Sequence, residues 1–170
     1  MLGLPVVAGS LAVGLLVTSS AGADTVLVSE GSESHLPAFV DLTGARYVSD
    51  ADGFSARLSV RDLKLRTATV GFTLTFPRSE QVFRVSTTRT KGGKQVYLVT
   101  RDRSGKKPAR TCAEFVSTWD DTRDRVDIHV PWSCLGDQRA TMKVSGRLHS
   151  GTRSASGTGD SVKTVRVAYT

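Results

Sequence analysis

From residue 37 onward, apolar side chains recur at every second position of the chain. This is the period of a β-strand that has one face in the core and the other in water. No stretch of ten residues shows the 3.6-residue period of an amphipathic helix. The alternating runs predict strands at residues 54–61, 69–76, 126–130, 142–149 and 162–169.

Two further runs, residues 82–86 and 95–100, are apolar on both faces, and we expect them to lie centrally in a sheet. Lys91–Lys94 joins them and predicts a tight hairpin. The Gly- and Ser-rich segment 150–160 predicts a flexible loop. Short strands spaced about a dozen residues apart predict an all-β antiparallel sandwich, jelly-roll or immunoglobulin-like. We expect one such domain over residues 37–170.

The N-terminal residues 1–23 carry no charged side chain and end in small residues. Ala21 and Ala23 have the A-x-A spacing of a signal-peptidase site, so we predict a signal peptide cleaved after Ala23 and an extracellular protein. No Lys or Arg precedes the apolar core, which departs from the usual pattern. The alternative is an uncleaved anchor, but a spanning helix needs roughly 20 apolar residues. Residues 24–36 then form an N-terminal arm, or a first strand at 25–28.

The chain has two cysteines, Cys112 and Cys134. An even number in an exported chain predicts a disulfide, and the paired cysteines or nearby histidines of a zinc site are missing. The strand before the second cysteine ends at Pro131, which cannot donate a hydrogen bond to a sheet. We expect Trp132 to cover the end of the core there.

The same corner, Val130 to Gly136, carries a resemblance. With Cys112 upstream and the earlier Val60-Arg61-Asp62-Leu63, it resembles a "VPxSCLG" motif of uncharacterised secreted bacterial proteins. Such domains look like the β-sandwiches of the DOMON and family 9 carbohydrate-binding type. The resemblance covers residues 45–150 and implies a fold without implying an activity. Trp132 departs from the motif, which has a basic residue there.

The composition is basic, with a formal net charge of +7 and a sequence pI near 9.8. Outside a cell this favours anionic partners, such as cell-wall polymers, acidic polysaccharides or lipid headgroups. Export argues against nucleic acid, and no P-loop, dinucleotide or nucleic-acid motif occurs. The basic residues are nevertheless scattered along many strands, as in any soluble basic protein. The densest run, either a binding site or a solvated hairpin tip, contains Arg101, Arg103, Lys106, Lys107 and Arg110.

Trp119 and Trp132 are the candidate carbohydrate-binding aromatics, because an exposed ring offers a sugar a flat apolar face. Trp119 is the better placed, next to the acidic loop at residues 120–124. The alternative is that both tryptophans cap the core.

Two acidic clusters are candidates for calcium. The first, Asp50 and Asp52, precedes Gly53 but lacks the glutamate that completes a calcium loop. The second cluster has two arginines interleaved with its carboxylates. Solvated turn residues are the alternative for both clusters. The second cluster consists of Asp120, Asp121 and Asp124.

Nucleophilic catalysis needs a base and an orienting group beside a Ser or Cys. Of the three histidines, His129 and His149 fall on the polar phase of strands, and we expect both to face water. Gly159-Asp160-Ser161 lacks the strand-to-helix elbow of a hydrolase. We therefore expect no enzyme and, calcium aside, no cofactor.

These observations favour a secreted, non-enzymatic binding module for a cell-envelope polysaccharide or another anionic polymer. No stable membrane span is expected after processing. Two alternatives stay open: an extracellular protein–protein interaction domain, and a secreted hydrolase whose carboxylates meet only in three dimensions.

Overall fold

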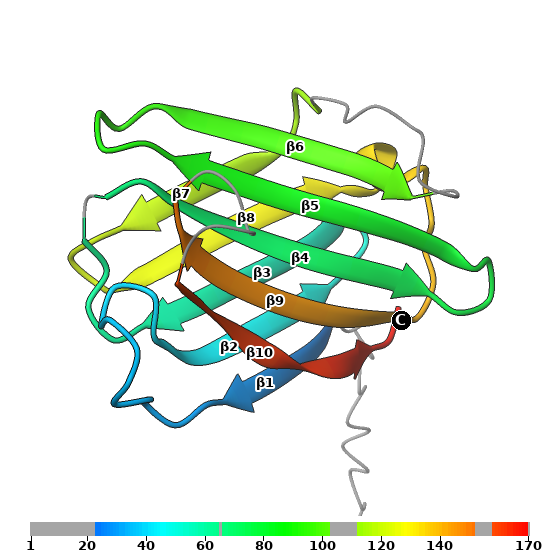
Figure 1. The fold of residues 1–170 in the computed structure, drawn as a ribbon. Coiled ribbons are helices and arrows are strands. Elements are labelled where there is room, and N and C mark those ends of the chain that lie inside the picture. Colours follow the sequence, from blue (N-terminus) through cyan, green and yellow to red (C-terminus); the bar gives the residue numbers. More distant parts are fainter. Residues whose placement is uncertain (1–22, 65, 103–111, 152–157, 170) are drawn as a thin grey trace, which may run out of the picture.

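The computed structural model describes residues 23–64, 66–102, 112–151 and 158–169 of the chain. In this part, two antiparallel five-stranded sheets pack face to face, which confirms the predicted sandwich (Figure 1). Sheet A consists, in spatial order, of β1 (Asp24–Ser29), β2 (Leu42–Ser49), β3 (Gly53–Val60), β8 (Arg125–Pro131) and β7 (Val116–Asp120). Sheet B, in front in Figure 1, consists of β10 (Gly159–Val167), β9 (Met142–Ser150), β4 (Ala68–Phe76), β5 (Gln81–Arg89) and β6 (Gln95–Asp102).

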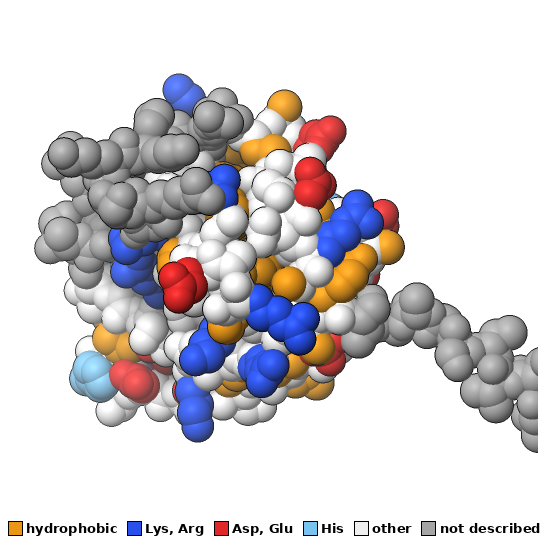
Figure 2. All heavy atoms as spheres, turned by 90° about the vertical axis from the view of Figure 1, so that its right-hand side faces the viewer, with side chains coloured by type: hydrophobic (Ala, Val, Ile, Leu, Met, Phe, Trp, Pro, Cys, Tyr) orange, Lys and Arg blue, Asp and Glu red, His pale blue; other side chains and the backbone are white. Residues whose placement is uncertain are grey.

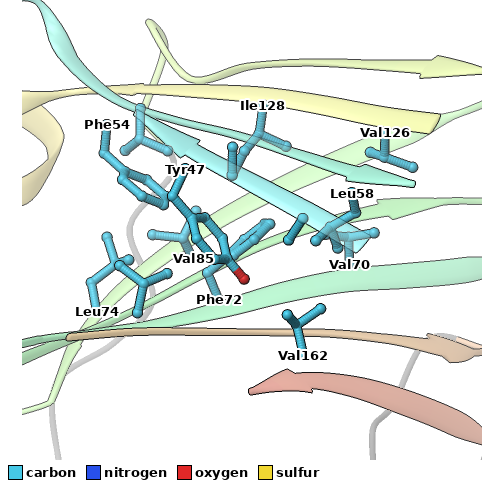
Figure 3. Close-up of a cluster of buried hydrophobic side chains, with 14 of the residues drawn as sticks. Tyr47, Phe54, Leu58, Val70, Phe72, Leu74, Val85, Val126, Ile128 and Val162 are labelled. Atoms are coloured by element: carbon cyan, nitrogen blue, oxygen red, sulfur yellow. The ribbon is translucent and has the colours of Figure 1, made fainter. Parts of the chain in front are cut away.

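The core lies between the sheets and is built from the apolar phase of each strand (Figure 3). Tyr47, Phe54 and Phe72 form its aromatic centre, with ring centroids 6.1–6.2 Å apart. Leu58 and Val126 pair across β3 and β8 and are fully buried. Each such side chain contributes about 1.5–3 kcal/mol through burial, so the alternation that predicts the strands also stabilises the sandwich.

The corner after β8 is as the sequence predicts. The strand ends at Pro131, and the chain turns through η1 (Trp132–Leu135) to Gly136, whose φ of 65° suits glycine. The Trp132 side chain is 1% exposed, donates from Nε1 to the Asp50 carbonyl oxygen at 2.8 Å and packs edge-on against Tyr169. It closes the end of the core.

The disulfide between Cys112 and Cys134 is present, with the two Cα atoms 5.8 Å apart. Cys112 lies in a turn rather than on a strand. Phe115 N donates to the Cys112 carbonyl oxygen in a turn, and β7 starts only at Val116. The disulfide therefore joins the turn before β7 to the turn after β8.

Residues 24–29 form a strand rather than a free arm: β1 pairs with β2 along its whole length. Asp24 also accepts a hydrogen bond from the Ala168 N–H beyond β10, at 2.5 Å. The first strand of sheet A is thereby joined to the last strand of sheet B.

Two predictions about position are wrong. The run at residues 82–86 forms β5, which lies inside sheet B between β4 and β6 as expected, but the run at 95–100 forms β6, which lies at the edge of that sheet. The outward side chains of β6, Val96 and Leu98, remain 40% and 38% exposed. His149 does not face water but is buried, at 6% exposed. Gly159 lies opposite it on β10, and a Cβ placed on that glycine would be 2.7 Å from His149 Cβ, so the glycine lets the two strands approach closely here.

The predicted signal peptide lies outside the described residues, apart from Ala23, and so does most of the predicted loop at 150–160. Within the described part, no helix is long and apolar enough to cross a membrane.

Replacing both cysteines with serine tests how far the sandwich depends on its disulfide. The bond closes a loop with a sequence separation of 22 residues. We expect the double variant to lose about 3 kcal/mol of unfolding free energy by the loop-entropy relation, measured by urea denaturation. Wild-type protein kept in reductant is the control and should match the variant. A loss below about 1 kcal/mol would show that the corner is held by packing instead.

Candidate functional site

The outer face of sheet A is hollowed by a groove of about 440 Å³, lined from β2, β3, β8 and β7. A second hollow of about 380 Å³ shares Arg46 and Arg57 with it and extends to Leu27 on β1. The two hollows together cross all five strands, a width of about 19 Å at ~4.8 Å per strand spacing. We call this feature the sheet A groove.

Strand register lines up the charges in the groove. Arg46 on β2 lies opposite Arg57 on β3, which lies opposite Asp127 on β8. Like charges facing each other across a ladder repel, but Arg57 is neutralised, since its Nε is 2.6 Å from Asp127 Oδ1. Arg46 is exposed and has no ion-pair partner among the described residues. One uncompensated guanidinium therefore stands in the middle of the groove.

Asp127 also holds the arginine beside it. Its Oδ2 lies 3.1 Å from Arg125 Nε, and Arg125 Nε lies 3.6 Å from Asp120 Oδ2. These exposed or half-exposed pairs contribute little to stability, about 0–1 kcal/mol each. They do pair Arg57 and Arg125 with carboxylates, whereas Arg46 is left to bind an external anion.

A second row of side chains runs parallel to the first. Val48, Ser55, His129 and Val116 face one another in sequence across β2, β3, β8 and β7. Ser55 Oγ and His129 Nδ1 are 2.9 Å apart and hydrogen-bonded. Among the described residues, no carboxylate is hydrogen-bonded to this imidazole. The row supplies apolar walls and one polar pair, without the third member of a catalytic triad.

The two candidate tryptophans are used by the fold. Trp132 is buried, so it offers no face to a sugar, as the core-capping alternative holds. Trp119 points between the sheets at their open edge and is half-buried. The Arg89 guanidinium lies over its ring, 4.7 Å from the centroid, and is itself held by Asp121 Oδ1 at 2.8 Å. One face of the Trp119 ring is thus already occupied by a cation.

Of the five candidate residues in the basic run, only Arg101 lies within the described part of the chain. Arg101 lies on β6, with its guanidinium 6.0 Å from the centre of the Phe83 ring. It is half-buried rather than projecting into solvent. The remaining candidates of this run, Arg103, Lys106, Lys107 and Arg110, lie outside the described residues.

The acidic clusters serve as turn caps and ion-pair partners. Asp50 Oδ1 accepts hydrogen bonds from the Asp52 and Gly53 amides, both at 3.0 Å. Asp120 Oδ1 accepts in the same way from the Thr122 and Arg123 amides, at 3.2 and 3.1 Å. Asp124 Oδ1 accepts from the Leu63 amide at 2.7 Å. The described residues contain no group of three or more His, Cys, Asp or Glu side chains placed to hold a metal. The structure therefore gives the calcium expectation no support.

No protein-family model matches the chain, and no curated protein matches it significantly.

The sequence did not single out Arg46, Arg57 or Asp127. All three lie on the polar phase of alternating runs, and that phase was a signal that they face outward. Their alignment depends on β3 pairing with β8, which joins Arg57 to a residue 70 positions away. Nothing local in the sequence encodes that pairing.

Asp50 variants test whether this residue is a turn cap or a calcium ligand. Asn keeps the oxygen that accepts the two amide hydrogen bonds, so we expect Asp50→Asn to keep the melting temperature. Asp50→Ala should cost about 1 kcal/mol, the usual value of a lost side-chain-to-backbone bond. Millimolar calcium should leave the wild-type melting temperature unchanged in thermal denaturation. A calcium-dependent rise that Asp50→Asn abolishes would establish a metal site.

Proposed function

We propose that this protein is a secreted, non-enzymatic binding module that holds an anionic cell-envelope polymer, such as an acidic polysaccharide, in the sheet A groove. The observation that carries the proposal is Arg46, an exposed guanidinium without an ion-pair partner among the described residues, at the point shared by the two hollows. A carboxylate or sulfate group would be bound there by charge-assisted hydrogen bonds. Val48 and Val116 would contact the apolar face of the backbone.

The shape of the groove favours an extended ligand. Its hollows run across the strands from Val116 on β7 to Leu27 on β1, a span of about 19 Å from the usual strand spacing. A compact metabolite would leave most of this length unused. A linear polymer would place one acidic group at Arg46 and further units on either side.

The distribution of charge supports a local site rather than general adhesion. Figure 2 shows Lys and Arg side chains dispersed among acidic and apolar ones over the end of the molecule that it views. Dispersed exposed charges are screened by salt and confer little selectivity. Selectivity needs a cation that lines a shaped recess, and Arg46 lines both hollows of the groove.

The predicted secretory N-terminus and the disulfide support an extracellular setting, because structural disulfides persist in oxidising compartments. The lack of a free aromatic platform at Trp119 and Trp132 favours recognition by charge over stacking on a neutral sugar.

Arg46→Gln tests the proposal directly. We expect about fivefold weaker retention of the purified protein on insoluble acidic polysaccharide, equivalent to about 1 kcal/mol. The measurement is a sedimentation binding assay at low and high salt. Arg139→Gln is the matched control, because Arg139 is also exposed, lies outside the groove and loses the same charge.

Equal weakening by Arg46→Gln and Arg139→Gln would show that net charge drives the adhesion and that the groove is not the binding site. No retention of the wild type on any acidic polymer would overturn the proposed function and favour a protein partner. The exposed Leu27 and Val116 at the two ends of the groove would then be the first residues to examine.

Asp127→Asn is expected to strengthen binding. The change removes the carboxylate that neutralises Arg57 and leaves two adjacent guanidiniums free to face the polymer. We expect retention at low salt to rise about threefold, with most of the gain lost at high salt through screening. Asp137→Asn, which removes an exposed acid outside the groove, is the control. Unchanged or weaker binding by Asp127→Asn alone would contradict the role given to Arg57.

A further inference from the structure

Sheet B carries a separate hollow of about 510 Å³, lined from β4, β9 and β10 and by Glu30, which follows β1. It lies where β10 departs from regular pairing. Val162 pairs with Gly146 and Val165 with Val144, so Lys163 and Thr164 together lie opposite one residue of β9. Such a β-bulge redirects side chains and is frequent beside binding sites. We call this hollow the bulge pocket.

Two cations without acidic partners line the bulge pocket. Arg147 and Lys163 form no ion pair with any described residue. Arg147 lies along the sheet surface over Gly71, where a Cβ would be 3.6 Å from its Nε. The glycine thus leaves room for the guanidinium to lie across β4. Two free cations from neighbouring strands, β9 and β10, are suited to one doubly charged oxyanion.

The pocket also contains hydroxyl groups that the fold does not use. None of them is hydrogen-bonded through its side chain to another described residue. They come from three neighbouring strands, so they face one recess from different sides. They belong to Thr73, Ser145, Ser161 and Thr164.

A buried polar group lies beneath Gly146, on the core side of β9. The Tyr47 hydroxyl is fully buried, has no hydrogen-bond partner, and would lie 2.8 Å from a Cβ placed on Gly146. In Figure 3 it points toward the side of the core where Val162 lies. Burial, and secondarily the charge of Glu30, raises the pKa of Tyr47 well above its ordinary value, so it stays a neutral donor.

Glu30 gives the pocket a second kind of chemistry. Its Oε1 accepts a hydrogen bond from the Lys163 amide at 3.0 Å, which ties the bulge to the chain beyond β1. The carboxylate repels a bare anion but accepts hydrogen bonds from alcohols. The pocket therefore combines cations for an oxyanion with an acceptor for neighbouring hydroxyl groups.

We propose that the bulge pocket binds a phosphate ester of a polyol, with the phosphate on Arg147 and Lys163 and a polyol hydroxyl on Glu30. The Ser and Thr hydroxyls complete the contacts to both parts of the ligand. This site lies on the other sheet from the groove, and it does not depend on the polymer-binding proposal.

The test is titration of the isotopically labelled protein with glycerol 1-phosphate, followed by NMR amide shifts of β9 and β10. Glycerol, inorganic phosphate and inorganic sulfate are titrated in parallel. We expect saturable shifts with glycerol 1-phosphate, at least tenfold weaker binding of the other three, and no shifts around Arg46. Arg147→Gln with Lys163→Gln should weaken binding at least tenfold. Lys143→Gln with Arg166→Gln is the matched control, because it also removes one exposed cation from each of β9 and β10, both outside the pocket.

Glu30→Gln separates the two halves of the site. Removing the negative charge should tighten binding of inorganic phosphate severalfold and reduce the preference for glycerol 1-phosphate over it. Thermal denaturation of each variant confirms that it is folded before its affinity is compared.

Three outcomes would overturn the proposal. The first is equal weakening by the control pair, Lys143→Gln with Arg166→Gln, and by the pocket pair, which would mean that surface charge alone drives binding. The second is binding of inorganic phosphate or sulfate as tight as that of the ester. Equal binding of phosphate would mean that the polyol is not recognised, and equal binding of sulfate would mean that the site does not select phosphate. The third is no saturable shift in β9 and β10. The groove proposal is tested by Arg46→Gln on polysaccharide, so either proposal can fail without the other.

Discussion

The burial of one face of each sheet is the constraint on which the rest of the structure depends. Strand side chains alternate, so fixing Tyr47 and Phe54 in the core also fixes Arg46 and Ser55 on the outer face. A slip of one residue would exchange the two sets and move charges into the core. The groove on sheet A is thus set by the same register that packs the aromatic centre, and its chemistry follows from residues the core excludes.

The open ends and edges of the sandwich explain why both tryptophans are buried or half-buried. Two packed sheets leave open ends, and large flat side chains are well suited to cover them. Trp132 closes one end beside the disulfide, and Trp119 bridges the sheets under the Arg89 guanidinium. A chain with only two tryptophans, both used in this way, has none left as a free platform. This is why both proposed sites rely on charge, hydroxyl groups and shape.

The sequence was informative where the signal was local. Period-two alternation, Pro131 and the two cysteines predicted the sandwich, its corner and its disulfide, since each depends on neighbouring residues or on the pairing of only two thiols. It failed for β6 and His149, because apolar content does not tell an edge strand from a central one, and burial by a facing glycine is non-local. The groove and the bulge pocket depend on register between distant strands, which alternation alone leaves open.

The two outer faces differ in how they treat their cations. On sheet A an acidic residue neutralises Arg57 and leaves Arg46, whereas around the bulge both Arg147 and Lys163 are left without acidic partners. A net charge of +7 attracts anions to the whole molecule, but only unpaired cations in recesses can distinguish one anion from another. Because the core fixes both faces in one sandwich, the extended anionic polymer and the phosphate ester that we propose as ligands would occupy opposite sides and would not compete for the same residues.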